Sequence, residues 1–252
     1  MLLRDSFAKV DICAISFNSN SIDMKNQKRV LFVLTSHDKL GSTSEKTGFW
    51  IEEFASPYYH LTDHKILVDI ATPKGGQAPI DPKSNDPSFQ TDATKRYFED
   101  DETQKLVAKT MRIKEVDSSN YDAVFYPGDH GPLWDLANDQ DSISLIETFY
   151  QSNKPVAFVC HAPAALKSAT LGNSKPLISG KKLTAFSNSE EEAVGLHKVV
   201  PFAVEEMIKS NGGHYEKAED WSSFVVEDGL LITGQNPQSS FQVANKLLER
   251  LQ

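Results

Sequence analysis

The chain has 252 residues, which suits one large α/β domain and is long enough to bury a sizeable core. Its 26 Lys and Arg residues against 35 Asp and Glu residues give a formal charge of -9. This charge disfavours nucleic acids and anionic membranes as partners, because the mean field repels them. No apolar run approaches the roughly 20 residues of a membrane-spanning helix. With only Cys13 and Cys160, we expect no disulfide framework and a reducing, cytoplasmic compartment.

Residues 1–27 mix charged residues with short apolar pieces and are predicted to be a loose N-terminal extension. Met24 lies just before the first convincing strand, so we consider it an alternative start of the native chain. From residue 28 on, apolar runs alternate with helix-like segments, as in βα units around a mostly parallel sheet. The predicted strands are 30–34, 65–70, 123–126, 156–160, 183–186, 224–226 and 230–233. The predicted helices are 47–55, ending by Pro57, then 142–150 and a closing helix at 236–251.

The pattern weakens between residues 75 and 115, where glycines and prolines punctuate a polar segment that precedes a charged helical stretch. We interpret this segment as an insertion over the sheet edge or the mouth of an active site. Residues 28–252 are therefore predicted to form a single domain. Its fold class is an α/β three-layer sandwich, with a mostly parallel central sheet and helices on both faces.

Cys160 lies at the end of the apolar run 155–159 and is followed at once by His161 and the small-residue segment 162–166. This pattern predicts a buried strand that turns sharply into a helix, with a thiol at the corner. The positive end of a helix dipole favours thiolate, so the position suits a nucleophile. A buried cysteine that only packs as a small apolar side chain is the alternative.

Other polar groups follow predicted strands, where ligands collect in parallel α/β sheets. The Gly-rich turn 127–132 exposes backbone N–H groups suited to an oxyanion site, although it also fits an ordinary tight turn. An acid in the helix after the first strand could face the thiol and carry a proton. We interpret Glu52 as part of a solvated helix face. The run 190–192 fits the acidic first turn of a capped helix, one member of which could orient His161.

Taken in order, these segments resemble the ThiJ/PfpI superfamily of class I glutamine amidotransferase-like proteins. Within it, the resemblance is to the branch of glutathione-independent class III glyoxalases and related heat-shock chaperones. It covers about residues 28–251. The matching motifs are Thr47-Gly48 with Glu53, the segment 79–84, Gly128-Asp129-His130-Gly131 with Asp135, Val159-Cys160-His161, and the segments 186–191 and 233–240.

The resemblance implies a flavodoxin-like fold and a catalytic site without a metal or other cofactor. By it, Cys160 is the nucleophile, Glu53 the acid that contacts it, and His161 with Glu191 the rest of a triad. The implied oxyanion hole consists of backbone N–H groups of Gly128, Asp129 and His161. Two positions depart from the family pattern, because Ala162 and Asp129 replace usual glycines.

The implied function is a cofactor-independent lyase of the glyoxalase III, or D-lactate dehydratase, type. It would detoxify methylglyoxal to lactate through a hemithioacetal on Cys160, without glutathione. The alternatives are a protein or nucleotide deglycase with the same cysteine and a stress-inducible holding chaperone; a peptidase or amidase ranks lower. The expected partners are a small reactive dicarbonyl substrate and a second copy of the chain in a homodimer.

Overall fold

The computed structural model describes residues 27–172 and 174–252. The predicted N-terminal extension and the alternative start at Met24 therefore lie, apart from residue 27, outside the described residues. No helix in the described part of the chain is long and apolar enough to cross a bilayer.

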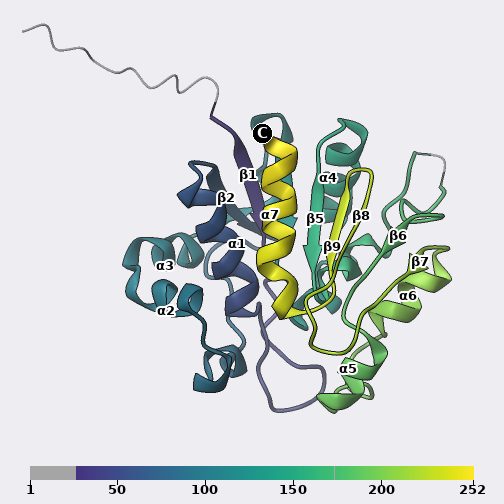
Figure 1. The fold of residues 1–252 in the computed structure, drawn as a ribbon, viewed down its shortest axis with the longest axis horizontal. Coiled ribbons are helices and arrows are strands. Elements are labelled where there is room, and N and C mark those ends of the chain that lie inside the picture. The colour runs from purple at the N-terminus through teal and green to yellow at the C-terminus, as the bar shows by residue number, and fades with distance from the viewer. Residues whose placement is uncertain (1–26, 173) are drawn as a thin grey trace, which may run out of the picture.

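A seven-stranded sheet forms the centre of the fold, in the order β3-β2-β1-β4-β5-β9-β8 (Figure 1). Its strands are β1 (Arg29–Val33), β2 (Leu67–Thr72), β3 (Met111–Arg112), β4 (Ala123–Tyr126), β5 (Val156–Val159), β8 (Val225–Asp228) and β9 (Leu231–Gly234). All neighbouring pairs are parallel except β8 and β9. The predicted mostly parallel sheet is confirmed.

Helices cover both faces of this sheet, which confirms the three-layer sandwich (Figure 1). The α-helices of the described residues are α1 (Ile51–Asp63), α2 (Asp92–Glu99), α3 (Asp101–Ala108), α4 (Gln140–Gln151), α5 (Asn188–Ala193), α6 (Val204–Ser210) and α7 (Ser240–Leu251). Alternate side chains of β1 enter two separate cores. Leu31 and Val33 pack with Ile146 of α4, whereas Val30 and Phe32 pack with Phe54 of α1. Strands apolar at every position therefore fill both sides of the sheet.

Helix α1 contradicts the predicted end at Pro57, because it continues through that residue to Asp63. Pro57 cannot donate to the carbonyl of Glu53, and a proline inside a helix costs about 3 kcal/mol. The added turns bury Tyr59 and Leu61, and α1 packs against α7 and α2. This burial outweighs the missing hydrogen bond.

The predicted strand 183–186 was wrong in extent and placement. Only β6 (Lys182–Leu183) is a strand, and it pairs with β7 (His214–Tyr215) in a separate two-stranded sheet. The Thr184 N–H donates to the side-chain oxygen of Thr233 at 2.9 Å, so a side chain replaces the next rung of the ladder. The strand therefore ends at Leu183, and the chain turns toward α5.

The strand order changes direction between β1 and β4. From β1 the chain moves outward to β2 and β3, and then returns to add β4, β5 and β9 on the other side. Ligands of open α/β sheets bind beyond the carboxyl ends of the strands at such a point. The residues that follow β1, β4 and β5 converge there.

Candidate active site

Cys160 occupies a sharp corner immediately after β5. Its φ of 61° lies in the left-handed region, which costs a residue other than glycine about 1–2 kcal/mol. Two backbone hydrogen bonds hold it there: its N–H donates to Gly234 and its carbonyl accepts from Phe186, both at 2.9 Å. The predicted strand-to-helix corner is present, but the following helix is a short 3₁₀ segment, Ala162–Leu166.

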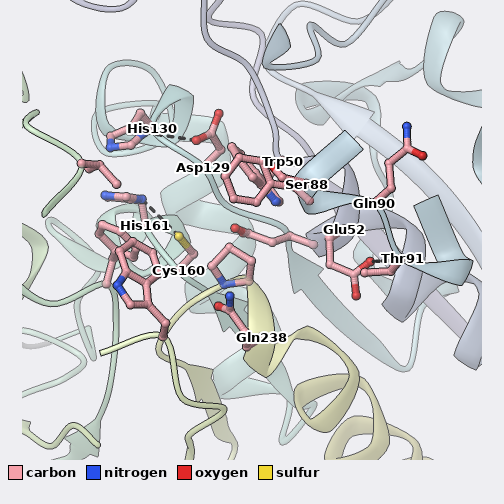
Figure 2. Close-up of a pocket in the computed structure, with 16 residues that line it drawn as sticks. Trp50, Glu52, Ser88, Gln90, Thr91, Asp129, His130, Cys160, His161 and Gln238 are labelled. Carbon is pink, nitrogen blue, oxygen red and sulfur yellow. Dashed lines mark hydrogen bonds and ion pairs between the residues drawn. The ribbon is translucent and has the colours of Figure 1, made fainter. Parts of the chain in front are cut away.

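Two side chains, His161 and Glu191, form a chain of hydrogen bonds that starts at the thiol. Cys160 Sγ lies 3.2 Å from His161 Nδ1, and His161 Nε2 lies 2.7 Å from Glu191 Oε2 (Figure 2 shows the first contact). Because an ionised carboxylate only accepts, the proton of a neutral His161 belongs on Nε2, which leaves Nδ1 facing the thiol. Glu191 is placed by α5, whose first turn is closed by a capping box of Ser187 and Glu190, as the acidic run predicted.

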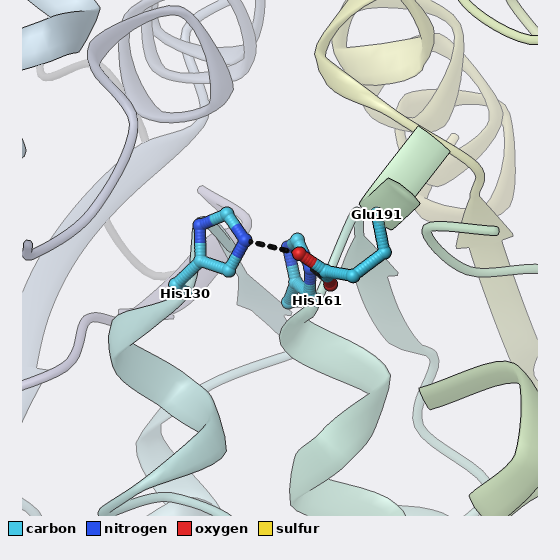
Figure 3. Close-up of side chains that lie close together, drawn as sticks. All are labelled: His130, His161 and Glu191. Carbon is cyan, nitrogen blue, oxygen red and sulfur yellow. Dashed lines mark hydrogen bonds and ion pairs between the residues drawn. The ribbon is translucent and has the colours of Figure 1, made fainter. Parts of the chain in front are cut away.

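A second histidine, His130, shares the same carboxylate. Its Nε2 lies 2.8 Å from Glu191 Oε1 and its Nδ1 lies 3.1 Å from Asp129 Oδ1 (Figure 3 shows His130, His161 and Glu191). The ring centroids of His130 and His161 are 4.1 Å apart. Sequence reasoning missed this residue because it considered only the backbone of the 127–132 turn. The signal was a histidine four residues after the end of β4, beside an acidic residue.

The hydrogen bonds of His130 determine its charge. Burial alone would lower its pKa, but the hydrogen bonds with Asp129 and Glu191 raise the pKa of His130 to about 10. Both nitrogens donate, so the ring is an imidazolium. Burial and the positive His130 lower the pKa of His161, which is thereby held neutral. Despite its burial, Glu191 has a lowered pKa because both histidines face it.

The group of His130, His161 and Glu191 also brings three possible metal-ligand atoms within 4.8 Å of one another. Both oxygens of Glu191 and the Nε2 atoms of both histidines are already engaged in hydrogen bonds with one another. We therefore interpret the group as a proton-binding cluster.

Glu53 lies on the other side of the thiol, in the first turn of α1. It is fully buried; Oε2 accepts the Gly128 N–H at 2.7 Å, and Oε1 has no hydrogen-bond partner among the described residues. Burial and the nearby Asp129 raise the pKa of Glu53 well above its usual range, although the thiol of Cys160 partly opposes this. The carboxyl therefore holds a proton at neutral pH.

The expectation that the corner favours thiolate was wrong. Burial, together with Glu53 and Asp129, raises the pKa of Cys160 well above that of a free thiol. A five-residue 3₁₀ helix supplies too little dipole to offset two neighbouring acids. The Asp129 N–H opposes the shift by donating to the sulfur. The resting group is therefore a thiol.

The backbone donors near the sulfur differ from the prediction at one position. The Gly128 N–H is used by Glu53, so Gly128 does not belong to an oxyanion hole. Among the hydrogen bonds of residues 27–172 and 174–252, none uses the N–H of His161, while that of Asp129 faces the sulfur. Asp129 adopts φ 78°, a conformation that glycine favours and Asp tolerates. Its charge is balanced by His130.

A pocket of about 550 Å³ opens above the thiol (Figure 2). It is lined by Trp50, Glu52, Glu53, Ser88, Phe89, Gln90, Thr91, Asp129, His130, Cys160, His161, Phe186, Val194, Trp221, Pro237 and Gln238. The structure thus places residues 88–91 of the predicted 75–115 insertion in the pocket wall. Glu52 was wrongly interpreted as solvated: it lines the pocket and accepts from the Thr91 hydroxyl at 2.5 Å. Burial raises the pKa of Glu52.

The sequence profile of the DJ-1/PfpI family matches residues 46–250. The chain belongs to this family. One relative, "Glutathione-independent glyoxalase HSP31" of Saccharomyces cerevisiae, is 30% identical over 89% of this chain and 98% of its own length.

Two solved structures are also similar to this chain. The Francisella tularensis Rapid Encystment Protein 24 kDa has a TM-score of 0.86 and 36% identity, covering 90% of this chain and 100% of the other. Glyoxalase III of Candida albicans has a TM-score of 0.83 and 27% identity, covering 89% of this chain and 97% of the other.

Proposed function

We propose that this DJ-1/PfpI protein is a glutathione-independent glyoxalase that converts methylglyoxal to lactate. The observation that carries the proposal is the buried thiol of Cys160, with His161 Nδ1 at 3.2 Å on one side and the protonated Glu53 on the other. Relatives named as glyoxalases that cover nearly all of the chain support it. The substrate is a small dicarbonyl, and neither glutathione nor a metal takes part.

The first step forms a hemithioacetal. The Cys160 sulfur attacks the aldehyde carbon while its proton passes to His161 Nδ1, and Glu53 gives its proton to the carbonyl oxygen. Because both transfers accompany the new S–C bond, no free thiolate is required. The raised pKa of Cys160 is therefore compatible with catalysis. The Asp129 N–H, which faces the sulfur, orients it.

The second step moves hydrogen between the two carbons. Ionised Glu53 removes the proton from the hemithioacetal carbon, and protonated His161 supplies one to the neighbouring ketone oxygen, which gives an enediol. Glu53 then returns its proton to the second carbon while His161 takes the remaining hydroxyl proton, so the product is a lactoyl thioester of Cys160. Glu53 is suited to this shuttle because its Oε1 has no hydrogen-bond partner in the part of the chain that the structure describes.

Water completes the cycle. It attacks the thioester carbonyl and gives its proton to Glu53, while the departing sulfur recovers a proton from His161. Lactic acid leaves, and Cys160, His161 and Glu53 return to their first protonation states. The sum is methylglyoxal plus water to lactic acid, with no oxidant or reductant.

Glu191 and His130 are positioning residues in this scheme. Glu191 fixes the ring and tautomer of His161 through the 2.7 Å hydrogen bond. The positive charge of His130, one ring away, makes protonated His161 a stronger acid, so it returns its proton readily. We also propose that the protein acts in the cytoplasm as a homodimer.

The test is lactate formation from methylglyoxal without glutathione, with chiral analysis of the product. We expect wild type to be active, C160A to be inactive and the lactate to be a single enantiomer. Substantial turnover by C160A would overturn the proposal. A deglycase would instead act on preformed adducts when free methylglyoxal is held constant. A chaperone would suppress the aggregation of other proteins, and its C160A variant would do so as well.

A further inference from the structure

The pocket above Cys160 is far larger than methylglyoxal requires. Methylglyoxal has five non-hydrogen atoms. If each takes about 30 Å³, the volume of one water molecule in the liquid, the whole molecule occupies roughly 150 Å³. The pocket measures about 550 Å³, within the range of sites that enclose molecules of drug size. Most of the space therefore lies beyond the two carbons that react.

Aromatic rings form much of the wall of this additional space. Trp50 and Phe89 meet edge to face at 5.1 Å, and Phe186 and Trp221 do so at 5.7 Å. Phe89 and Trp221, which both line the pocket, are 50% and 42% exposed, although both are large apolar side chains. A ligand ring placed among them would cover apolar surface that now faces water.

The charges of the pocket oppose an anionic ligand. Among the described residues that line it there is no Lys or Arg, while Glu52 and Asp129 contribute carboxyl groups and Glu53 contributes a protonated one. The one positive group, His130, is 8% exposed and already bound to two carboxylates. A negatively charged substituent would lose its water without gaining a cation.

We propose that this site prefers uncharged 2-oxoaldehydes that carry an aromatic or other large apolar group over methylglyoxal. The inference rests on the proposed glyoxalase function and names its substrate class. The aldehyde carbon bonds to Cys160 as before, while the substituent lies against Phe89 and Trp221. With phenylglyoxal the same proton transfers and one water yield mandelic acid, and no further reactant is required.

The first experiment compares kcat/KM for methylglyoxal and phenylglyoxal on the full chain. Each value is divided by the rate constant for hemithioacetal formation with mercaptoethanol, which removes the difference in intrinsic reactivity. We expect phenylglyoxal to be favoured at least tenfold. A normalised ratio of one or less overturns the inference, while turnover of methylglyoxal leaves the proposed function intact. If wild type turns over neither compound, the proposed function itself fails.

The second experiment tests the charge argument with 4-carboxyphenylglyoxal and its uncharged carboxamide, which have nearly the same shape. We expect the carboxylate to have a kcat/KM at least tenfold below that of the carboxamide. Equal values would mean that the acidic lining does not select substrates, and would overturn that half of the inference.

A pair of variants then locates the preference. F89A removes a ring from the pocket wall, and F98A removes an exposed ring, 39% accessible, that does not line the pocket. We expect F89A to lower the ratio of phenylglyoxal to methylglyoxal kcat/KM at least threefold, whereas F98A keeps the wild-type ratio. The same ratio in F89A, F98A and wild type would show that the aromatic wall does not bind the substituent.

Discussion

Replacing His130 by Asn removes the positive charge next to the proposed base, and its effect on the pH dependence of catalysis can be worked out from the structure. His161 acts as a base in its neutral form. Burial and the imidazolium of His130 lower its pKa. In H130N the pKa of His161 rises, so the ring stays protonated up to a higher pH. The acidic limb of kcat/KM therefore moves to higher pH.

The size of this shift follows from the distance between the two rings. Two unit charges 4.1 Å apart in an effective dielectric of about 20 repel by about 4 kcal/mol, or about 3 pH units. Asp129 and Glu191 contact His130 directly, Glu191 also contacts His161, and Glu53 is protonated. Both carboxylates remain in H130N but lose their cationic partner, so the uptake of a proton by one of them offsets part of the change. We therefore expect a shift of about 1–2 pH units.

The assay is the initial rate of lactate formation from methylglyoxal between about pH 5 and pH 9, fitted for the acidic limb of kcat/KM. H37N is the matched control, since His37 stacks on Trp134 and does not line the pocket. An unchanged limb in H130N, with folding verified by thermal unfolding, would refute the assignment of His130 as a cation. A general loss of rate without a shift would mean that His130 only supports the fold.

Three further predictions test the surroundings of the thiol. E53Q should lower kcat for lactate formation by about 10²–10⁴, because the amide still accepts the Gly128 N–H but carries no transferable proton; a loss under threefold would exclude Glu53 as the shuttle. G128A should reduce both activity and the free energy of unfolding, the latter by about 1–3 kcal/mol, since its Cβ would lie 2.4 Å from the Val159 carbonyl oxygen. G229A, whose Cβ meets nothing within 4 Å, should lose only about 1–2 kcal/mol through its positive φ and stay active. In urea unfolding, the free energy of unfolding of D81N should exceed that of wild type by about 2 kcal/mol at pH 8, and the two should be nearly equal at pH 4. Burial and Asp129 raise the pKa of Asp81 to about 7, so wild-type stability falls as pH rises from about 4 to 7; an equal gain at both pH values would contradict this.

The central strands were predictable because their physics is local. Strands β1, β4 and β5 lie between two layers of helices, so every position in the runs at 30–33, 123–126 and 156–159 is apolar and buried. By contrast β3, β6 and β7 are two residues long, and no periodicity can be read from two residues. The predicted helix end at Pro57 was wrong because α1 is stabilised beyond that residue by packing against α7, which lies nearly 200 residues farther along the chain.

The residues of the site also differ in how far the sequence predicts their placement. Cys160 and His161 are neighbours at a strand end, so the sequence alone placed them together. Glu191 and Glu53 came from the family resemblance, and the structure places both beside that pair. The charge of His130 could not be inferred, because it depends on the left-handed conformation of Asp129 and on a carboxylate 61 residues farther on.

The protonation states of the cluster explain why a raised thiol pKa suits this chemistry. At neutral pH, Asp129 and Glu191 are ionised around the His130 cation, and Glu53 keeps its proton beside the sulfur. A free thiolate would add a negative charge to a buried site that already holds more anions than cations. A thiol that loses its proton only as a carbonyl oxygen accepts one from Glu53 avoids that state. The site is therefore arranged to react with an electrophile that can take up a proton, which an aldehyde does and a simple alkylating agent does not.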